Sequence, residues 1–177
     1  MDKRSLRKSI KAIIATLNTE YTAQSSIIIC SKLLKNDRYL NAQNVFVYLS
    51  TDKEVCTDLI IEDLVKRNRN IYIPLCIDND MYAVKYPCEL IKNKYGILEP
   101  SSGLSDTIKV EDIDLAIVPC LSASKDGKRL GHGKGYYDRF LNDDLYTICL
   151  CFEKLLSEEI EMDEYDRYMN EVITEGE

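Results

Sequence analysis

Three short runs of almost uninterrupted apolar residues constrain the fold of this chain more than any other feature. They are residues 44–49 (NVFVYL), 114–118 (DLAIV) and 145–152 (LYTICLCF). Strands that are buried on both faces read as continuous apolar runs, whereas half-exposed strands alternate apolar and polar residues. The three runs therefore indicate the centre of a parallel sheet that is covered on both sides.

The segments between these runs show helical periodicity, with apolar residues three and four positions apart. Helices are expected over residues 2–18, 21–36, 55–68 and 136–142, the second with Ile27, Ile28, Leu33 and Leu34 inward. Further strands are expected at 71–75, stopping at Pro74 or just after it, at 81–86 and at 172–174, with loops from 87 to 112. This alternation predicts one domain over residues 1–177, a three-layer α/β/α fold with a mostly parallel central sheet.

Length and charge restrict the function. A chain of 177 residues can bury one core, and apolar and charged fractions of 45% and 30% are those of a globular protein. The net charge of −7 argues against a nucleic-acid partner, and no run is long enough for a membrane span. We expect a monomer. An acidic chain that binds an anion must gather its cations locally.

The cysteines indicate a reducing compartment. There are seven, an odd number, with one histidine and no CxxC pair, so free thiols are expected and a structural zinc site is not. Met1 is followed at once by charged residues rather than by an apolar leader, which favours the cytoplasm. Cys149 and Cys151 alternate along an apolar run and should share one face of a strand.

The segment 125–141 (KDGKRLGHGKGYYDRFL), here called the glycine-rich segment, carries the strongest chemical signal. Glycines at 131, 133 and 135 let a backbone approach a bulky anion closely and adopt φ > 0. Arg129 and Lys134 supply positive charge, and Asp138 could hold a magnesium ion that bridges phosphates. A helix starting near Tyr136 would point its amino end at the same place. The segment is therefore predicted to bind phosphate.

An alternative interpretation is that Gly131 to Gly135 form a flexible surface hairpin, with Asp126-Gly127 as an ordinary turn. The segment is not a Walker P-loop, because GxxxxGK[ST] is absent. Nor is it a dinucleotide fingerprint, because the spacing is GxGxG and the preceding strand ends some distance earlier. Composition and spacing alone stop at a phosphate-bearing ligand.

Residues 129–141 resemble the segment R-L-G-x-G-x-G-Y-Y-D-R-x-L that marks the 5-formyltetrahydrofolate cyclo-ligases. The resemblance extends over nearly the whole chain. It includes residues 3–7 (KRSLR), similar to K-x-x-L-R, and 49–57 (LSTDKEVCT), similar to a segment ending in E-x-x-T. Residues 96–100 (GILEP) are similar to G-x-x-E-P, and 114–119 to the strand before the loop.

The resemblance implies a reaction and two cofactors. The family uses ATP and Mg²⁺ to close 5-formyltetrahydrofolate, a reduced folate, to 5,10-methenyltetrahydrofolate, giving ADP and phosphate. ATP is needed because a formamide oxygen leaves poorly unless it is converted into a phosphate. Positioning and charge neutralisation dominate catalysis of phosphoryl transfer, which suits a loop of glycines and cations.

The resemblance also implies site residues. Arg129 and Lys134 would be catalytic, and Asp138 and Asn170 would bind the metal. ATP would contact Lys3, Arg4, Ser5, Leu6, Arg7, Arg129, Leu130, Gly131, His132, Gly133, Lys134, Gly135, Tyr136 and Tyr137. The folate would contact Arg7, Leu49, Glu54, His132, Gly133, Lys134, Gly135 and Tyr136.

Several of these residues have a structural alternative. Lys3 and Arg7 could form a solvated helix face, and Glu54 could open the following helix. One of the tyrosines at 136 and 137 is expected to be a core aromatic. His132 occupies a variable position of the motif, so it is expected to face ligand or water rather than to act as an acid or base.

Two positions depart from the family pattern. Asn170 stands where an aspartate is usual, so it offers an oxygen without charge, and Asp166 or Glu171 could compensate. Cys120 stands where a glycine often follows Val-Pro. A different phosphoryl-transfer enzyme on a similar scaffold, or a binding protein without turnover, are the alternative functions.

Overall fold

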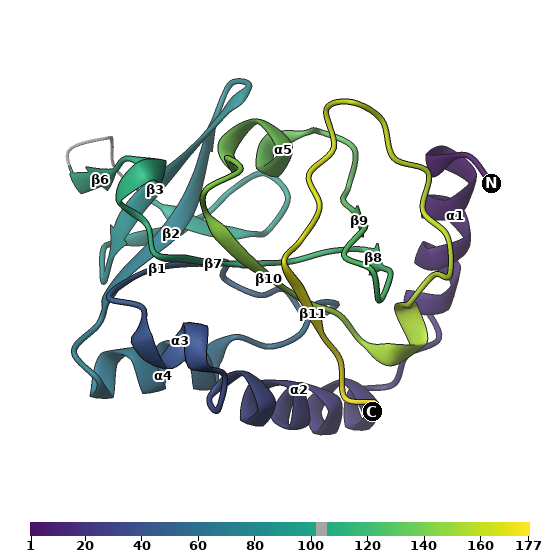
Figure 1. The fold of residues 1–177 in the computed structure, drawn as a ribbon, viewed down its shortest axis with the longest axis horizontal. Coiled ribbons are helices and arrows are strands. Elements are labelled where there is room, and N and C mark those ends of the chain that lie inside the picture. The colour runs from purple at the N-terminus through teal and green to yellow at the C-terminus, as the bar shows by residue number, and fades with distance from the viewer. Residues whose placement is uncertain (102–105) are drawn as a thin grey trace.

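The computed structural model describes residues 1–101 and 106–177, which fold around one mixed, mostly parallel sheet (Figure 1). The strand order is β11-β10-β7-β1-β2-β3-β6; the first five strands of this order run parallel, and β3 runs antiparallel to both of its neighbours, β2 and β6. The expected α/β fold is thereby confirmed. The strands are β1 (Asn44–Val47), β2 (Asn70–Ile77), β3 (Asp80–Tyr86), β6 (Thr107–Ile108), β7 (Leu115–Val118), β10 (Tyr146–Leu150) and β11 (Glu171–Ile173).

Helices cover both faces of the sheet (Figure 1). On one face lie α2 (Thr19–Leu33), α3 (Asp37–Asn41) and α4 (Asp58–Lys66). On the other lies α5 (Tyr136–Phe140), whose Phe140 ring centre is 4.9 Å from that of Phe46 in β1. The helix α1 (Lys3–Ile14) stands at one end, against the 3-10 turn η3 (Glu153–Leu155).

The core follows from the apolar runs. Every residue of β7 is buried, as are residues 45–47 of β1 and 147–150 of β10. Cys149 and Cys151 are both buried, in keeping with a shared face, and all seven cysteines are free thiols. In the described part of the chain, no helix is long and apolar enough to cross a membrane.

The strand expected to stop near Pro74 continues to Ile77, so that prediction is wrong. β1 pairs with β2 only at residues 70–72, and from Pro74 onward β2 pairs with β3 alone. The missing N–H of proline therefore interrupts no ladder on the β1 side.

Residues 87–112 are not all loop. They contain the hairpin of β4 (Leu90–Lys92) and β5 (Leu98–Pro100), the edge strand β6 and the 3-10 turn η2 (Val110–Asp112). Short strands at a sheet edge carry little apolar periodicity, which is why the pattern missed them. The expected turn formers Ser102 and Gly103 lie outside the described residues.

The inward face expected for the second helix is partly wrong. Ile27 and Ile28 are 57% and 44% exposed, whereas Ile29, Cys30 and Leu33 are buried. A run of three consecutive isoleucines fits more than one helical face, so periodicity alone could not decide which of them turns inward. The first helix also ends at Ile14, leaving Leu17 in the connection to α2.

The parallel strands bring several loops together at one edge of the sheet. Because β1, β2, β7 and β10 are parallel, their carboxyl ends meet at one edge, and the loops that follow them converge there. The hairpin of β8 (Ser122–Ala123) and β9 (Arg129–Leu130) follows β7 at this edge. It leads the chain directly into residues 131–135, here called the glycine loop.

Candidate active site

The glycine loop lies beyond a hairpin rather than inside one. Asp126-Gly127 forms the turn between β8 and β9, as the surface-hairpin alternative required, and Gly127 has φ +92°. Gly133 and Gly135 have φ +94° and +69°, and α5 begins directly after Gly135. The two glycines thus hold backbone conformations that other residues rarely adopt. The surface-hairpin interpretation therefore holds for the turn at residues 126–127 and not for the glycine loop at residues 131–135.

Arg7 reaches the glycine loop from α1. Asp2 caps this helix by accepting hydrogen bonds from the N–H groups of Arg4 and Ser5 at 2.9 and 3.0 Å. Nε of Arg7 donates to the carbonyl of Gly131 at 2.8 Å. A Cβ on Gly133 would lie 3.2 Å from Cζ of Arg7, so the absence of a side chain at 133 makes room for the guanidinium.

Arg129 is the buried cation of the site. It is 9% exposed, and its Nε donates to the carbonyl of Pro119 at 2.8 Å, just after β7. Its guanidinium carbon lies 4.7 Å from the ring centre of Tyr137, which itself packs against Phe46. A Cβ on Gly131 would lie 3.1 Å from Nη2. Arg129 therefore lies against the glycine loop at Gly131. Of the two tyrosines, Tyr137 is the one that packs against the core.

Glu54 lies on the other side of Arg129. Its Oε2 accepts a hydrogen bond from Thr51 N–H at 2.8 Å, and because α4 begins only at Asp58, Glu54 does not open that helix. Burial raises the pKa of Glu54, while the bond from Thr51 and the charge of Arg129 act in the opposite direction. A partly buried carboxylate thus faces the cationic loop.

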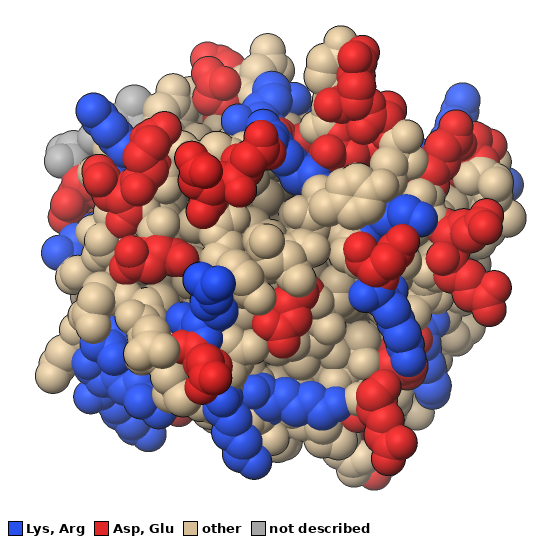
Figure 2. All heavy atoms as spheres, in the orientation of Figure 1, with Lys and Arg blue, Asp and Glu red and all other residues tan. Residues whose placement is uncertain are grey.

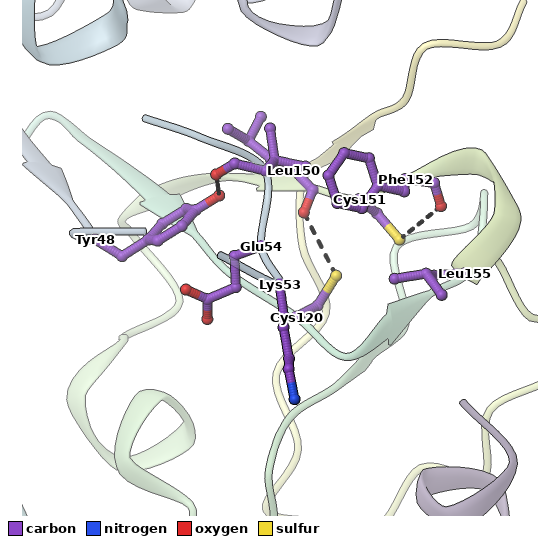
Figure 3. Close-up of a pocket in the computed structure, with 9 residues that line it drawn as sticks. Tyr48, Lys53, Glu54, Cys120, Leu150, Cys151, Phe152 and Leu155 are labelled. Atoms are coloured by element: carbon purple, nitrogen blue, oxygen red, sulfur yellow. Dashed lines mark hydrogen bonds between the residues drawn. The ribbon is translucent and has the colours of Figure 1, made fainter. Parts of the chain in front are cut away.

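A pocket adjoins Glu54 at the carboxyl ends of β1, β7 and β10 (Figure 3). Its free space is about 220 Å³, part of it open to solvent. In Figure 3, Glu54 and Lys53 point in different directions, and the sulfur of Cys120 points to the Leu150 carbonyl, 3.5 Å away. The part of the pocket that a water molecule can enter measures only about 10 Å³, roughly the space of one water, so the pocket itself encloses no ligand.

Positive charge gathers around His132. The His132 side chain is exposed, but lost hydration and the charges of Lys11, Arg129 and Arg7 lower its pKa. A group of acidic residues lines the segment 156–170, here called the C-terminal strap, and Figure 2 shows acidic side chains along the upper and right-hand parts of the face in view. The local cluster of cations that we expected on this acidic chain is thus present around His132.

Lys3 is not at the loop. Its Nζ contacts Asp163 at 2.7 Å and also Asp166, both in the C-terminal strap. Burial alone would lower the pKa of Lys3, but the hydrogen bonds that Lys3 donates to the two aspartates outweigh it and raise that pKa. Lys3 therefore ties α1 to the strap, and the solvated-face alternative fits neither Lys3 nor the partly buried Arg7.

The two expected metal ligands, Asp138 and Asn170, bond to different parts of the chain. Oδ1 of Asp138 accepts from Arg167 N–H at 3.4 Å. Oδ1 of Asn170 already accepts from the N–H and Oγ1 of Thr147, at 2.8 and 3.0 Å, near the amino end of β10. Among the described residues, no group of three or more His, Cys, Asp and Glu could hold a metal. A magnesium ion could thus be held only with ligands from elsewhere, such as nucleotide phosphates.

The sequence did not point to two residues that contact Lys134. Tyr95, between β4 and β5, has its ring centre 4.3 Å from Nζ of Lys134. Arg139 donates from Nη1 to the Lys134 carbonyl at 3.0 Å. Tyr95 gives no signal in the sequence beyond being an exposed aromatic before Gly96, whereas Arg139 stands at a fixed arginine of the family motif. Leu49, expected to touch the folate, lies half-buried after β1.

Comparisons with known proteins identify a family and a fold that this chain matches. The model of the 5-formyltetrahydrofolate cyclo-ligase family matches residues 1–175. The 5-formyltetrahydrofolate cyclo-ligase of Mus musculus is 31% identical, covering 98% of this chain and 93% of that protein. A probable 5-formyltetrahydrofolate cyclo-ligase of Schizosaccharomyces pombe is 29% identical, over 98% and 95%. The NMR structure of Aquifex aeolicus 5,10-methenyltetrahydrofolate synthetase superposes with a TM-score of 0.86 at 25% identity, over 100% and 91%.

Proposed function

Because this chain belongs to the 5-formyltetrahydrofolate cyclo-ligase family and is an ATP-dependent cyclo-ligase of folate metabolism, we propose that its reaction takes place at the glycine loop. There the formyl oxygen of 5-formyltetrahydrofolate attacks the γ-phosphorus of ATP, and ADP leaves. N10 then closes the ring, and phosphate leaves with the former formyl oxygen. The match over nearly the whole chain speaks against a folate-free phosphoryl-transfer enzyme.

One observation carries this placement: two arginines from distant parts of the chain meet at the same loop. Arg7 bonds the Gly131 carbonyl from α1, and Arg129 in β9, held by the Pro119 carbonyl after β7, lies against Gly131. Lys134 stands on the exposed side of the loop. Fixed cations and backbone N–H groups stabilise the charge of a transferring phosphoryl group without reorganisation. Arg129 and Lys134 would neutralise that charge, and Arg7 would hold the loop and a phosphate.

The folate would lie between Glu54 and the loop. A buried carboxylate suits the N–H donors of a pterin, and Glu54 is oriented by its bond from Thr51. The adjoining pocket is too small to enclose any part of a reduced folate, so the molecule would lie outside it, along Leu49 and the loop. The formyl group would then sit between Glu54 and the cations.

Magnesium would enter with the nucleotide. Mg²⁺ usually takes one or two carboxylates together with substrate phosphates, and it would neutralise phosphate charge when bound. Asp138 is suited to this role, since it is partly buried and, among the described contacts, its carboxylate accepts only the long hydrogen bond from the N–H of Arg167. Asn170 would first have to give up its bonds to Thr147, so we place Asp138 alone at the metal.

The test is a spectrophotometric assay of methenyltetrahydrofolate formation from 5-formyltetrahydrofolate and Mg-ATP. Lys134→Ala and Asp138→Ala should each lower kcat/KM about a hundredfold or more, as expected for removal of a charge that stabilises a transition state. Lys66→Ala, on the opposite face of the sheet, is the control and should match the unmodified enzyme. Full activity in both loop variants would refute the placement.

We further propose that the enzyme acts as a monomer in the cytoplasm. Its own helices cover both faces of the sheet, and its seven free thiols suit a reducing compartment. A relative from Arabidopsis thaliana is named as mitochondrial, so fractionation of cells is the direct test of the compartment. Size-exclusion chromatography with light scattering would test the monomer, and a mass of twice 20.4 kDa would contradict it.

A further inference from the structure

The turn between β2 and β3 lies against the glycine-rich segment. Ile77 pairs with Asp80, so Asp78 and Asn79 are the two residues of the turn. Asp78 has φ +54°, a conformation that favours glycine. Both turn residues direct their backbone carbonyls to side chains of α5: the hydroxyl of Tyr136 donates to the Asp78 carbonyl at 2.8 Å.

Arg139 makes the larger part of this contact. Its Nε and Nη2 donate to the Asn79 carbonyl at 3.0 and 2.5 Å, and its Nη1 donates to the Lys134 carbonyl at 3.0 Å. Its guanidinium carbon is also 5.4 Å from the ring centre of Tyr136. One planar group therefore bridges the glycine loop and the turn, which a point charge such as lysine could not do equally well.

The loop depends on support from outside itself. α5 has five residues and its first turn has no side-chain cap, because Gly135 precedes it. Gly135 has φ +69°, and a Cβ there would lie 2.6 Å from Nη1 of Arg139. The missing side chain thus makes room for the guanidinium, in the same way as Gly133 makes room for Arg7.

We propose that Arg139 is a positioning residue: by holding the Lys134 carbonyl to the β2–β3 turn, it fixes the glycine loop in the shape that receives the phosphates of ATP. This inference rests on the proposed placement of ATP at the loop. Arg139 itself touches neither substrate in this scheme. Its side chain is exposed and contributes little to the core, so its removal should change the loop and leave the fold.

The first measurement is steady-state kinetics of Arg139→Ala, with ATP and folate varied in turn. A small misplacement of a binding loop can cost up to about a hundredfold in rate, and loss of charged hydrogen bonds about tenfold in binding. We expect KM for ATP to rise about tenfold, with little change in KM for the folate. Equal KM values in the variant and the unmodified enzyme, or equal rises for both substrates, would overturn the proposal.

Two further variants separate positioning from charge and from folding. Arg139→Lys keeps the charge but cannot bridge two carbonyls, so its KM for ATP should stay close to that of Arg139→Ala; full recovery would overturn the proposal. Ethylguanidinium added to Arg139→Ala should lower the raised KM for ATP, which a merely unfolded variant would not show. Arg67→Ala, which removes an arginine paired with Asp63 on α4, is the matched control.

Lys134→Ala separates failure of this inference from failure of the proposed site. If Lys134→Ala loses activity while Arg139→Ala keeps its KM for ATP, the loop is the ATP site and the role of Arg139 is refuted. If neither variant changes KM for ATP or kcat, the placement of ATP at the loop fails as well.

Discussion

Removal of the Lys3 ammonium group should destabilise the protein measurably. The Lys3 and Asp166 side chains are 18% and 15% exposed, so their ion pair is partly shielded from water. A hydrogen bond between charged groups in such a setting contributes about 1.5 kcal/mol, whereas the exposed contact to Asp163 adds little. For a domain of this size, about 1.5 kcal/mol corresponds to about 3–6 °C in melting temperature. We expect that decrease for Lys3→Met, which retains an apolar stem.

The assay is thermal unfolding by circular dichroism at neutral pH. Lys3 lowers the pKa of Asp163, so the stabilisation by this carboxylate is present above pH 3.8 and is lost as pH falls through the lowered value; neutral pH retains it in full. Lys8→Met is the matched control, since Lys8 is an exposed residue of the same helix. A decrease no larger for Lys3→Met than for Lys8→Met would refute the reasoning.

The same variants decide whether ATP recruits Lys3. A ligand raises stability by RT ln(1 + [L]/Kd), so Mg-ATP should raise the melting temperature of the unmodified enzyme. If phosphates take Lys3 from the strap, as the family resemblance implies, this rise will be smaller in Lys3→Met. An equal rise would assign Lys3 to structure alone.

Three other predictions concern single positions. Gly127→Ala should lower the free energy of unfolding in urea by about 2–4 kcal/mol, because φ is +92° and a Cβ there would clash with the Met169 carbonyl. Gly96→Ala, which has open space around it, should lower it by about 1 kcal/mol. A smaller cost for Gly127→Ala than for Gly96→Ala would contradict this. The pKa of His132 is lower in the folded protein than in the unfolded chain, so on acidification the unfolded chain takes up the proton first. The free energy of unfolding should therefore fall as pH drops below 6.5. His132→Gln should flatten that fall without abolishing turnover. Asn170→Asp should keep the melting temperature, since a carboxylate accepts the bonds from Thr147 equally well, whereas Asn170→Leu should lower stability by about 1–3 kcal/mol; equal melting temperatures would count against this account.

The central sheet could be predicted because its strands are buried on both faces. The runs at 44–49 and 114–118 contain β1 and β7, and the alternation of elements gave the α/β class. The antiparallel edge could not be predicted in the same way. The edge strand β6 is two residues long and pairs with β3, which lies well before it in the sequence. The separate hairpin of β4 and β5 is local, but its strands are only three residues long.

The candidate site was predictable where a residue acts through the backbone. Glycines at alternate positions indicated the loop, and the positive φ values of Gly133 and Gly135 explain why two of these positions are glycine. Partners distant in sequence could not be read in this way. That Lys3 pairs with Asp163 rather than with a phosphate site, and that Arg139 bonds the Asn79 carbonyl, depend on how the chain packs.

The ties between the two ends of the chain have a consequence for synthesis on the ribosome. Lys3 bonds residues 160 and 163 positions later, and Tyr21 bonds Glu175, which lies 154 positions later. β11, which follows the C-terminal strap in the sequence, pairs directly with β10 in the sheet. Until the strap and β11 have left the ribosome, α1 therefore has neither its ion-pair partners nor the strap beside it. The enzyme should become active only after these segments have emerged, because contacts of such long range close last.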